Sequence, residues 1–366
     1  MKTRSLSRLV VATAVALAAG AAFAQPASAE SNFKAGPSIN QVYEATNNAL
    51  GNSVQVFDRA PDGTLVAGAV VPTGGLGTGN SLASQGGIVR DGRRLLVVNA
   101  GDNTVTSFAI TRDGLSRRDV EASGGIRPVS VTVHDDVVYV LNTGSDSISG
   151  FHINDRGNLT PIANSAQALS TTGTGAAEVK FTRDGDALIV TEKATNTIDT
   201  FAVDEHGVAG TATFTTSVGV VPYGFDIDRR DHVVVSEAAT GSVSSYRFDD
   251  GPLSVTTGAL ADTQGAPCWL VISTDGRFAY TTNAASGTIS SYRIARDGSL
   301  TLLAAVAGTP GAGPTDVAVS SDGGFLYARV RNGDIAAFAI AADGSLTSLG
   351  SATGATAIGP SGLAAS

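Results

Sequence analysis

The sequence has little of what usually carries disulfide or metal chemistry. One cysteine, Cys268, stands among 366 residues, so the chain has no internal disulfide and its stability must come from packing. Next to Trp269, this cysteine is most simply a small buried residue. The four histidines fall on turns or on a C strand of the repeat frame described below, and none falls at the expected site. A His-ligated zinc or iron site and a Ser–His–carboxylate triad are therefore excluded.

Positive charge is also scarce. There are 24 Lys and Arg residues against 33 Asp and Glu residues, and the formal net charge is −9. This balance argues against nucleic acid and against anionic membrane surfaces as partners. Phosphate-binding loops are missing too, because the Gly-rich stretches at 75–80 and 173–177 lack the strand–GxGxxG–helix context and are expected to be plain loops.

Long helix-compatible windows are few, and aromatic residues make up only 6% of the chain. What the sequence has instead is glycine, with 44 residues, together with many Thr and Val. This composition predicts an all-β protein. The chain is long enough to bury a sizeable core.

The first 29 residues have the pattern of a secretory signal peptide. A basic start precedes a run rich in Ala, Val and Leu, and small residues at 27–29 form a cleavage site before Glu30; cleavage after Ala24 is an alternative. The apolar run is too short and too rich in Ala for a membrane span. We therefore expect a secreted protein, extracellular or periplasmic, whose net charge changes from −9 to −12 when these residues and their three basic side chains are removed.

One unit of sequence recurs along the rest of the chain. It consists of an Asp-Gly turn, an apolar run, a small-residue turn and a second apolar run, as in DGRFAYTTNAASGTISSYRIARDGSLT at 275–301. Such runs of β-branched and aromatic residues between Gly, Asp and Asn predict β-hairpins. Seven copies are present, at 43–65, 91–116, 134–160, 184–208, 228–254, 275–301 and 322–347.

A short strand precedes six of these copies and often begins with proline. Its first residues are at 83, 128, 176, 222, 267 and 314, with spacings of 45, 48, 46, 45 and 47 residues. A period in this range, with four short strands per unit, is the signature of a β-propeller. We therefore expect one seven-bladed β-propeller at 42–366, preceded by an N-terminal extension at 30–41.

The first copy has no inner strand before it. The chain ends with PSGLAAS, whose Pro360 lies 46 residues after Pro314 and therefore in frame. We expect this C-terminal segment to supply the inner strand of the N-terminal blade, which closes the ring and removes an open strand edge. The alternative is a frayed tail.

The two faces of such a ring differ. With the strands of each blade labelled A (inner) to D (outer), the A–B and C–D connections carry the Asp-Gly turns and form what we call the turn face, which is structural. The B–C and D–A connections form the opposite, loop face, where D–A loops such as 72–86 and 168–178 are longer and less regular. Function usually sits on variable loops of a repeated scaffold, so we place the site at the channel mouth on the loop face.

Two sets of equivalent positions point at this mouth. The last residue of the B strand is Asn in four of the seven copies but is Glu192 and Glu237 in two neighbouring blades. The third residue of the inner strand is Glu178 in the blade of Glu192, so these two carboxylates are expected within one blade's width. The expected site consists of three catalytic residues, Glu192, Glu178 and Glu237, and six substrate-binding residues, Arg127, Lys193, Tyr223, Trp269, Asp316 and Arg331.

The residues alone leave the chemistry of this cluster open. Clustered carboxylates near a channel can share a proton or have one pKa raised, which suits general acid–base catalysis. They can equally hold a calcium-like ion together with backbone carbonyls, and no other cofactor is expected. A third alternative is a network of Glu178, Glu192, Lys193 and Arg127 that only ties blades together. For the Asn residues, we expect hydrogen bonds that cap the B–C turn.

The repeated DGRxLxVxNxxxNTVxxFxI units and the Pro-led inner strands resemble the β-propeller lactonase family, which includes propeller-type 6-phosphogluconolactonases and carboxymuconate-lactonizing enzymes. The resemblance covers roughly residues 40–366. The segment GAAEVKFTRDGDALIVTEKATNTIDTFAV at 175–203 is similar to the family pattern GPRHxxFxPDGxxxYVxNExxxTVxxF. The match implies that Glu192 occupies the position of a motif glutamate proposed to be catalytic or substrate-binding. Ala177-Glu178 replaces the Arg-His of the pattern, so the family's proposed His base has no counterpart.

The resemblance implies a secreted lactonase-like hydrolase that acts on a lactone or related ester. In it, Glu192, helped by Glu178 or Glu237, activates water, and Arg127 or Lys193 stabilises the oxyanion. Export argues against a phosphorylated cytosolic sugar lactone as the substrate. The alternatives are a non-catalytic ligand- or protein-binding propeller of the cell envelope or extracellular space, and a metal-dependent esterase or phosphatase-like propeller. We expect a monomer.

Overall fold

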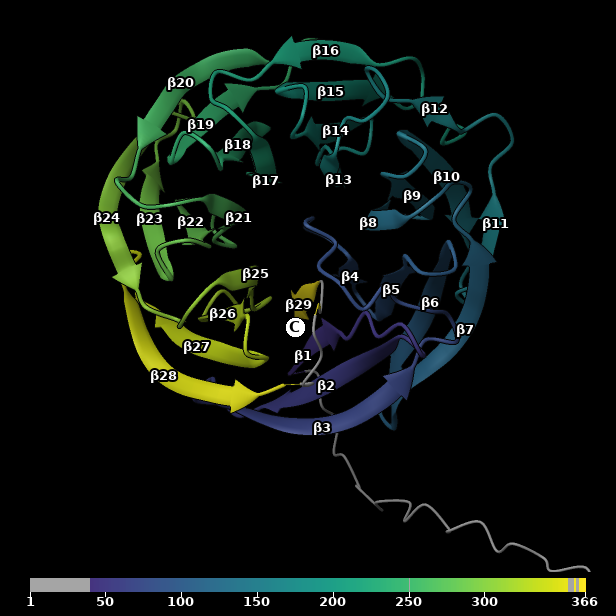
Figure 1. Cartoon of the computed structure of the whole chain (residues 1–366), viewed down its shortest axis with the longest axis horizontal. Coiled ribbons are helices and arrows are strands. Elements are labelled where there is room, and N and C mark those ends of the chain that lie inside the picture. The colour runs from purple at the N-terminus through teal and green to yellow at the C-terminus, as the bar shows by residue number, and fades with distance from the viewer. Residues whose placement is uncertain (1–39, 250, 355–358, 360–361) are drawn as a thin grey trace, which may run out of the picture. The chain divides into compact units, whose positions relative to one another are not determined.

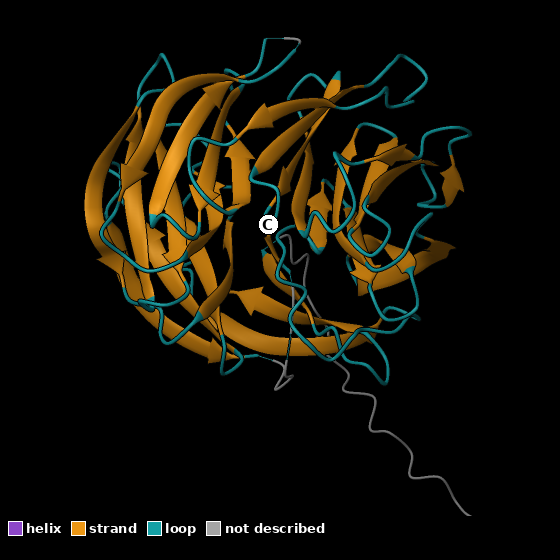
Figure 2. Ribbon diagram, turned by 45° about the horizontal axis from the view of Figure 1, so that its top comes forward, coloured by secondary structure: helices purple, strands orange, loops and turns teal. Residues whose placement is uncertain are grey.

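The computed structural model describes residues 40–366 except 250, 355–358, 360 and 361. In this part of the chain, seven antiparallel sheets are arranged as blades around a central channel (Figures 1 and 2). The expected all-β, seven-bladed propeller is therefore confirmed. The expected signal peptide at 1–29 and nearly all of the expected extension at 30–41 lie outside the described residues. Nothing in the described ranges is a helix long and apolar enough to cross a membrane.

Each blade is a sheet whose strands follow one another from the channel outward. Blade 1 contains β29 (Leu363–Ala365), β1 (Gln41–Ala45), β2 (Ser53–Arg59) and β3 (Leu65–Pro72). Blade 2 contains β4 (Ile88–Asp91), β5 (Arg94–Asn99), β6 (Thr104–Thr111) and β7 (Gly114–Ala122). Blade 3 contains β8 (Pro128–His134), β9 (Val137–Asn142), β10 (Ser147–Ile153) and an outer edge divided into β11 (Leu159–Pro161) and β12 (Gln167–Ala168).

The remaining four blades follow the same plan. Blade 4 contains β13 (Ala176–Phe181), β14 (Ala187–Glu192), β15 (Thr197–Ala202) and β16 (Thr213–Thr216). Blade 5 contains β17 (Pro222–Ile227), β18 (His232–Glu237), β19 (Ser242–Arg247) and β20 (Ser254–Ala261). Blade 6 contains β21 (Pro267–Ile272), β22 (Phe278–Asn283), β23 (Thr288–Ile294) and β24 (Leu300–Gly308). Blade 7 contains β25 (Pro314–Val319), β26 (Phe325–Val330), β27 (Asp334–Ile340) and β28 (Leu346–Thr353).

The core lies between the blades, because each sheet packs both of its faces against its neighbours. The B strand β14 is buried along its whole length and has a nearly continuous apolar run, ALIVTE. An alternating pattern is absent there because neither face of the strand meets water. The outer strands are different: β3 is exposed at most positions. Burial therefore decreases from the B and C strands to the rim.

Glycine-containing turns of the turn face fasten several blades to the next. Three B-strand tyrosines donate hydrogen bonds to the glycine carbonyl of the following blade's C–D turn, over 2.8–3.0 Å: Tyr139 to Gly207, Tyr280 to Gly344 and Tyr327 to Gly63. Gly63 has φ +87°, and a Cβ added there would overlap the ring of Phe325. The glycine is thus required both by the left-handed backbone and by the close approach of the neighbouring blade.

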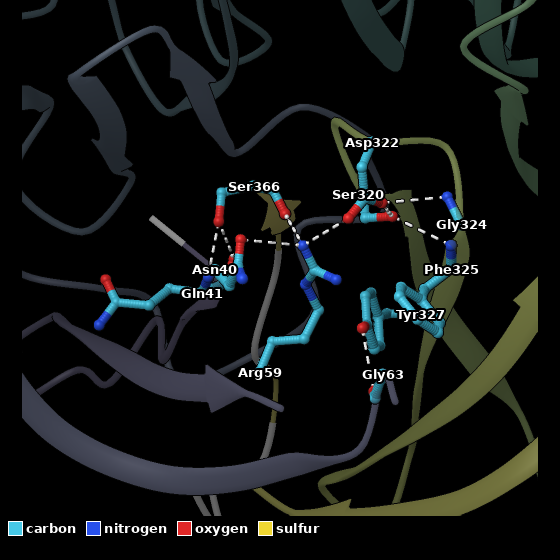
Figure 3. A network of polar contacts seen from close by, with 10 residues as sticks. All are labelled: Asn40, Gln41, Arg59, Gly63, Ser320, Asp322, Gly324, Phe325, Tyr327 and Ser366. Atoms are coloured by element: carbon cyan, nitrogen blue, oxygen red, sulfur yellow. Dashed lines mark hydrogen bonds and ion pairs between the residues drawn. The ribbon is translucent and has the colours of Figure 1, made fainter. Parts of the chain in front are cut away.

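The C-terminal strand closes the ring. β29 pairs antiparallel with β1, with Tyr43 opposite Ala364, so the expected closure is confirmed and the frayed tail is wrong. The Arg59 guanidinium reinforces this joint by donating to the side chains of Asn40 and Asp322 and to the main-chain oxygen of Ser366 (Figure 3). Because Asp322 belongs to the A–B turn of blade 7, one buried cation ties blade 1 to blade 7 and to the C-terminal strand.

We predict that Gly63→Ala destabilises the propeller more than Gly350→Ala. Both glycines have left-handed backbone, with φ +87° and +94°, so both substitutions carry about 1 kcal/mol of backbone strain. Only Gly63 faces a neighbouring ring, whereas a Cβ on Gly350 has no heavy atom within 4 Å. We therefore expect a further loss of about 1–3 kcal/mol for Gly63→Ala, measured as the free energy of unfolding in urea. Equal losses for the two variants would contradict the proposed contact between blades 1 and 7.

Candidate functional site

The channel is blocked at its mouth on the loop face by the segment that leads into β4. Figure 1 shows this segment reaching toward the centre of the ring. The Lys193 ammonium donates to the carbonyl of Ala83, and the Trp269 indole N–H donates to the carbonyl of Ser84 over 2.9 Å. The Ser84 hydroxyl in turn donates to the Val129 carbonyl over 2.9 Å. The segment is therefore attached to blades 3, 4 and 6.

Gln85 completes the block by spanning the channel. Its backbone N–H donates to the carbonyl of Ala177 in blade 4, and its side chain makes two hydrogen bonds with the backbone of Leu270 in blade 6. The side chain passes over Gly224, where an added Cβ would overlap its amide oxygen. The mouth at which the sequence places the site is therefore filled by the chain itself, and that placement stays a prediction. The chain fills the mouth because the inner strand expected from 83 begins only at Ile88, which leaves the preceding residues free to cross the channel.

An open cavity of about 310 Å³ remains in the other half of the channel, next to the turn face. The inner strands of the blades line it, and Gln85 lies at its inner end. Five charged side chains from four blades are among its lining residues: Arg90, Glu178, Lys180, Asp226 and Asp316. We refer to this space as the channel cavity and to these five residues as its charged lining.

Glu178 is buried in the channel and bridges two blades. Its Oε2 accepts a hydrogen bond of 2.8 Å from the N–H of Phe225, on the inner strand of the next blade. Burial raises the pKa of Glu178 well above its usual value of 4.5, and the nearby charges of Asp226 and Asp316 add to this effect. The Lys180 ammonium and the Phe225 N–H act in the opposite direction without reversing the shift. This arrangement favours the protonated form of Glu178 more than water would for an exposed glutamate.

Asp316 is the second buried carboxyl of the channel cavity. Its Oδ1 accepts from the N–H of Val317 over 2.7 Å, and its Oδ2 has no hydrogen-bond partner within the described ranges. Burial raises the pKa of Asp316 to about 7, although backbone N–H groups and the charge of Arg329 lower it. A carboxyl with a pKa near the working pH is suited to accept and release a proton.

Positive charge in the cavity comes from Lys180 and Arg90. The Lys180 ammonium lies 2.5 Å from the Asp226 carboxylate, and its side chain remains about a third exposed at 37%. Burial alone would lower the pKa of Lys180, but Asp226 and Glu178 outweigh it, so the pKa is raised and the side chain stays charged. The Nε of Arg90 is buried and has no hydrogen-bond partner among the described residues. In the same part of the chain, no three His, Cys, Asp or Glu side chains are placed to hold a metal ion together, and the calcium ion considered above stays a prediction.

The structure does not bring the three expected glutamates together. Glu192 accepts hydrogen bonds from the N–H and hydroxyl of Ser170 and from the hydroxyl of Thr195, all within the loop face of blade 4. Glu237 accepts, over 2.6 Å, from the hydroxyl of Ser217 in the loop between blades 4 and 5 and from the hydroxyl of Ser244 in blade 5. Glu192, Glu237 and Glu178 thus belong to three separate networks, so the expected convergence on one site is wrong.

The physical reason is that both B-strand glutamates do what asparagine does in other blades. Asn283 donates to Ser290, which lies seven residues later on the C strand, over 2.8 Å. Glu237 meets Ser244 at the same spacing. In blade 4 the residue at that position is Asp199, and burial, with Glu192 facing it, raises the pKa of Asp199 to about 9. Asp199 therefore keeps its proton at neutral pH and can donate it to Glu192, which explains how two carboxyls fit in one buried site.

The remaining expected residues are divided between the two halves of the channel. Lys193, Tyr223 and Trp269 cluster at the blocked mouth: the ammonium lies 4.8 Å from the centre of the Tyr223 ring, which is 5.2 Å from the Trp269 ring. Burial lowers the pKa of Lys193 to about 8. Arg127 and Arg331 are exposed on the loop face. Of the nine expected site residues, only Glu178 and Asp316 line the channel cavity.

Three residues of the charged lining were missed: Arg90, Lys180 and Asp226. A signal for two of them was present. Side chains alternate along a strand, so the fifth residue of an inner strand faces the channel as the third does. Lys180 is the fifth residue of β13, and Asp226 is the fifth residue of β17. Arg90 gave no such signal, because β4 begins later than the repeat frame predicts.

Comparison with known families and proteins gives a consistent result. The chain matches the family described as "Lactonase, 7-bladed beta-propeller" over residues 46–172, 165–264 and 236–362. A 6-phosphogluconolactonase of Yersinia pestis (strain Pestoides F) is 23% identical over 188 residues, which cover 49% of this chain and 56% of that protein. The match thus spans little more than half the length of the curated relative.

Two solved structures share the fold. The periplasmic gluconolactonase of Pseudomonas aeruginosa superposes with a TM-score of 0.70 at 18% identity, covering 88% of this chain and 98% of that one. A protein from Lactobacillus plantarum gives a TM-score of 0.73 at 17% identity, also covering 88% and 98%.

We predict that Asp316→Asn removes a pH-dependent loss of stability. The folded pKa of Asp316 is about 7, above the value of 3.8 in an unfolded chain, so folding favours the protonated form. The stability that this group contributes is fully present below about pH 4 and is lost as the pH rises through 7. The variant cannot ionise, so its free energy of unfolding relative to the wild type should rise by an amount on the order of 2–4 kcal/mol between pH 4 and pH 8.

Urea unfolding across this pH range measures the difference, and Asp113→Asn, on an exposed turn, serves as the control. A difference between wild type and Asp316→Asn that stays constant with pH would show that Asp316 ionises normally in the folded protein.

Proposed function

Because the chain belongs to the lactonase family of seven-bladed β-propellers, we propose that it hydrolyses a lactone or a related ester, and that the channel cavity is its active site. The observation that carries the proposal is that two buried carboxyls with raised pKa, Glu178 and Asp316, face one cavity beside the Lys180 ammonium. Two titratable groups held in different protonation states are what acid–base catalysis needs.

The proposed mechanism assigns one role to each group. Asp316 accepts a proton from a water molecule as that water attacks the lactone carbonyl carbon. Lys180 and Arg90 supply positive charge to the oxygen that becomes negative. When the ring C–O bond breaks, Glu178 gives its proton to the leaving alkoxide, and the product is the open hydroxy acid. Glu178 has its Oε1 available for this step, because only its Oε2 accepts from the Phe225 N–H.

The activities named for the similar proteins support the substrate class without fixing the substrate. One is a 6-phosphogluconolactonase and another a periplasmic gluconolactonase. We therefore propose a sugar lactone or a small aromatic lactone that enters from the turn face. The route follows from the block at the loop face, where Gln85 and Lys193 hold the chain across the channel.

The test is turnover of a panel of sugar and aromatic lactones by the purified protein. We expect kcat/KM to rise with pH through about 7 as Asp316 loses its proton, and Asp316→Asn to lower it by about 100-fold or more. We expect Glu192→Gln to keep activity once it is shown to be folded, because both Glu192 oxygens are engaged within blade 4. Loss of activity in Glu192→Gln with retention in Asp316→Asn would move the active site to the loop face.

A second candidate function is a non-catalytic binding propeller. The observation that favours it is the occupied mouth of the channel, where Gln85 makes three hydrogen bonds with blades 4 and 6. Under this alternative, the wild type would turn over every lactone at the buffer background rate. Lactone binding would still be measurable by calorimetry and would be lost in Lys180→Met, since that variant removes a charge of the cavity.

We also propose that the protein is exported, on the strength of the basic, apolar and small-residue pattern in residues 1–29. Expression of the full chain in a secreting bacterial host should release a protein that begins at Glu30, or at Gln25 with the alternative cleavage site. Intact-mass measurement of the culture medium or periplasmic fraction checks this. Retention of the uncleaved chain in the cytoplasm would refute export.

A further inference from the structure

An open groove of about 1400 Å³ lies on the turn face between blades 2 and 3, away from the channel. It is lined by the A–B and C–D turns of both blades and by part of β7. We call it the blade 2–3 groove. It is larger than the channel cavity, and nothing in the proposed hydrolysis uses it.

At the groove, the interface between neighbouring blades is filled by a different kind of side chain than in blades 5, 6 and 7. In blades 5, 6 and 7 the first residue of the B strand is His232, Phe278 or Phe325, and each ring packs beneath the C–D turn glycine of the next blade. In blade 2 that position is Arg94, whose side chain is 27% exposed and donates to the carbonyl of Asp135. A flexible charged side chain thus replaces a space-filling ring.

The lining carries an excess of unpaired positive charge. Five of its arginines are exposed, and none of them forms an ion pair with any described residue: Arg93, Arg112, Arg117, Arg118 and Arg156. They come from the A–B turn, C–D turn and outer strand of blade 2 and from the C–D turn of blade 3. In a protein of net charge −9, such a cluster is an unusual concentration of guanidinium groups.

Aspartates line the same groove. Asp91 lies 3.7 Å from Arg94, and Asp135 and Asp136 each lie 3.7 Å from a histidine ring, that of His134 and that of His152. Asp155 forms no ion pair within the described ranges. These carboxylates weaken the attraction of the groove for a ligand that offers only negative charge. It suits a ligand that offers anionic groups to the arginines and hydroxyl donors to the carboxylates.

We propose that the blade 2–3 groove binds an acidic polysaccharide chain, whose carboxylate or sulfate groups pair with the arginines and whose hydroxyls donate to the aspartates. Planar guanidinium groups bind such anions through paired hydrogen bonds. A single-stranded nucleic acid fits less well, because its bases need exposed aromatic side chains, and the one aromatic residue of the lining, Phe108, is buried. The spread of the arginines over four segments favours an extended ligand over a single small anion.

Binding can be measured with fluorescently labelled oligosaccharides of polygalacturonate and of heparin, which separate carboxylate from sulfate, at about 0.15 M salt. The groove variant is Arg112→Gln, Arg118→Gln and Arg156→Gln combined. The control is Arg183→Gln, Arg229→Gln and Arg230→Gln combined, which removes the same charge from exposed residues on the A–B turns of blades 4 and 5. We expect the groove variant to bind at least one of the two oligosaccharides about 10-fold more weakly or worse, and the control to lose less than about 2-fold.

A second variant tests the hydroxyl contacts. Asp136→Asn combined with Asp155→Asn makes the groove less negative, so simple charge attraction predicts tighter binding, whereas the proposal predicts weaker binding of the same oligosaccharide. Lactone turnover should be unchanged in every variant, so failure of polysaccharide binding is separate from failure of the proposed hydrolysis. The proposal is overturned if neither oligosaccharide binds, if groove and control variants weaken equally, or if a single-stranded oligonucleotide binds more tightly through the same arginines.

Discussion

The structure depends on the closure of its ring. The inner strand of blade 1 comes from the C-terminal end of the chain, and its partner β1 lies at the other end of the described residues. Arg59 holds this joint by linking Asn40, Ser366 and Asp322. The channel cavity depends on the same joint, because Leu363, Ala364 and Ala365 line it and the N–H of Leu363 approaches Asp316. Without β29, blade 1 would present an open edge and the cavity would lack a wall.

The closed ring contains two kinds of contact: contacts within a blade and contacts across the ring. Within blades 2 to 7, paired strands are close in sequence, and each hairpin follows the local turn and strand pattern. Across the ring, Gln41 contacts Ser366, 325 residues away, and Gln85 contacts Leu270, 185 residues away. The first kind of contact recurs in each copy, whereas the second kind is specific to one pair of residues. The charged lining belongs to the second kind, since Glu178, Asp226 and Asp316 approach one another only around the closed channel.

This division explains what the sequence could predict. Blade number, strand order and closure follow from a period of 45–48 residues and from the position of Pro360, so local pattern was sufficient for the fold. The site required contacts that no repeat encodes. Glu192 replaces the asparagine found in other blades. It accepts hydrogen bonds from the hydroxyls of Ser170 and Thr195 and faces a protonated Asp199. The Glu192 carboxylate is therefore already paired within the protein. In the sequence, only Asp199, seven residues later, could have indicated this.

A copy of the repeat that departs from the others is therefore more informative when its residue is smaller than when its residue carries an additional charge. An added polar group can find partners among its neighbours, as Glu237 does in Ser217 and Ser244. A missing side chain leaves space that another segment or solvent must fill. Gly224 stands where other inner strands carry Glu178 or Asp316, and Gln85 crosses the channel over it. Arg94 stands where a ring fills the blade interface in blades 5, 6 and 7, and a groove opens beside it. In both cases the missing bulk, rather than the added charge, decides where the molecule is closed and where it is open.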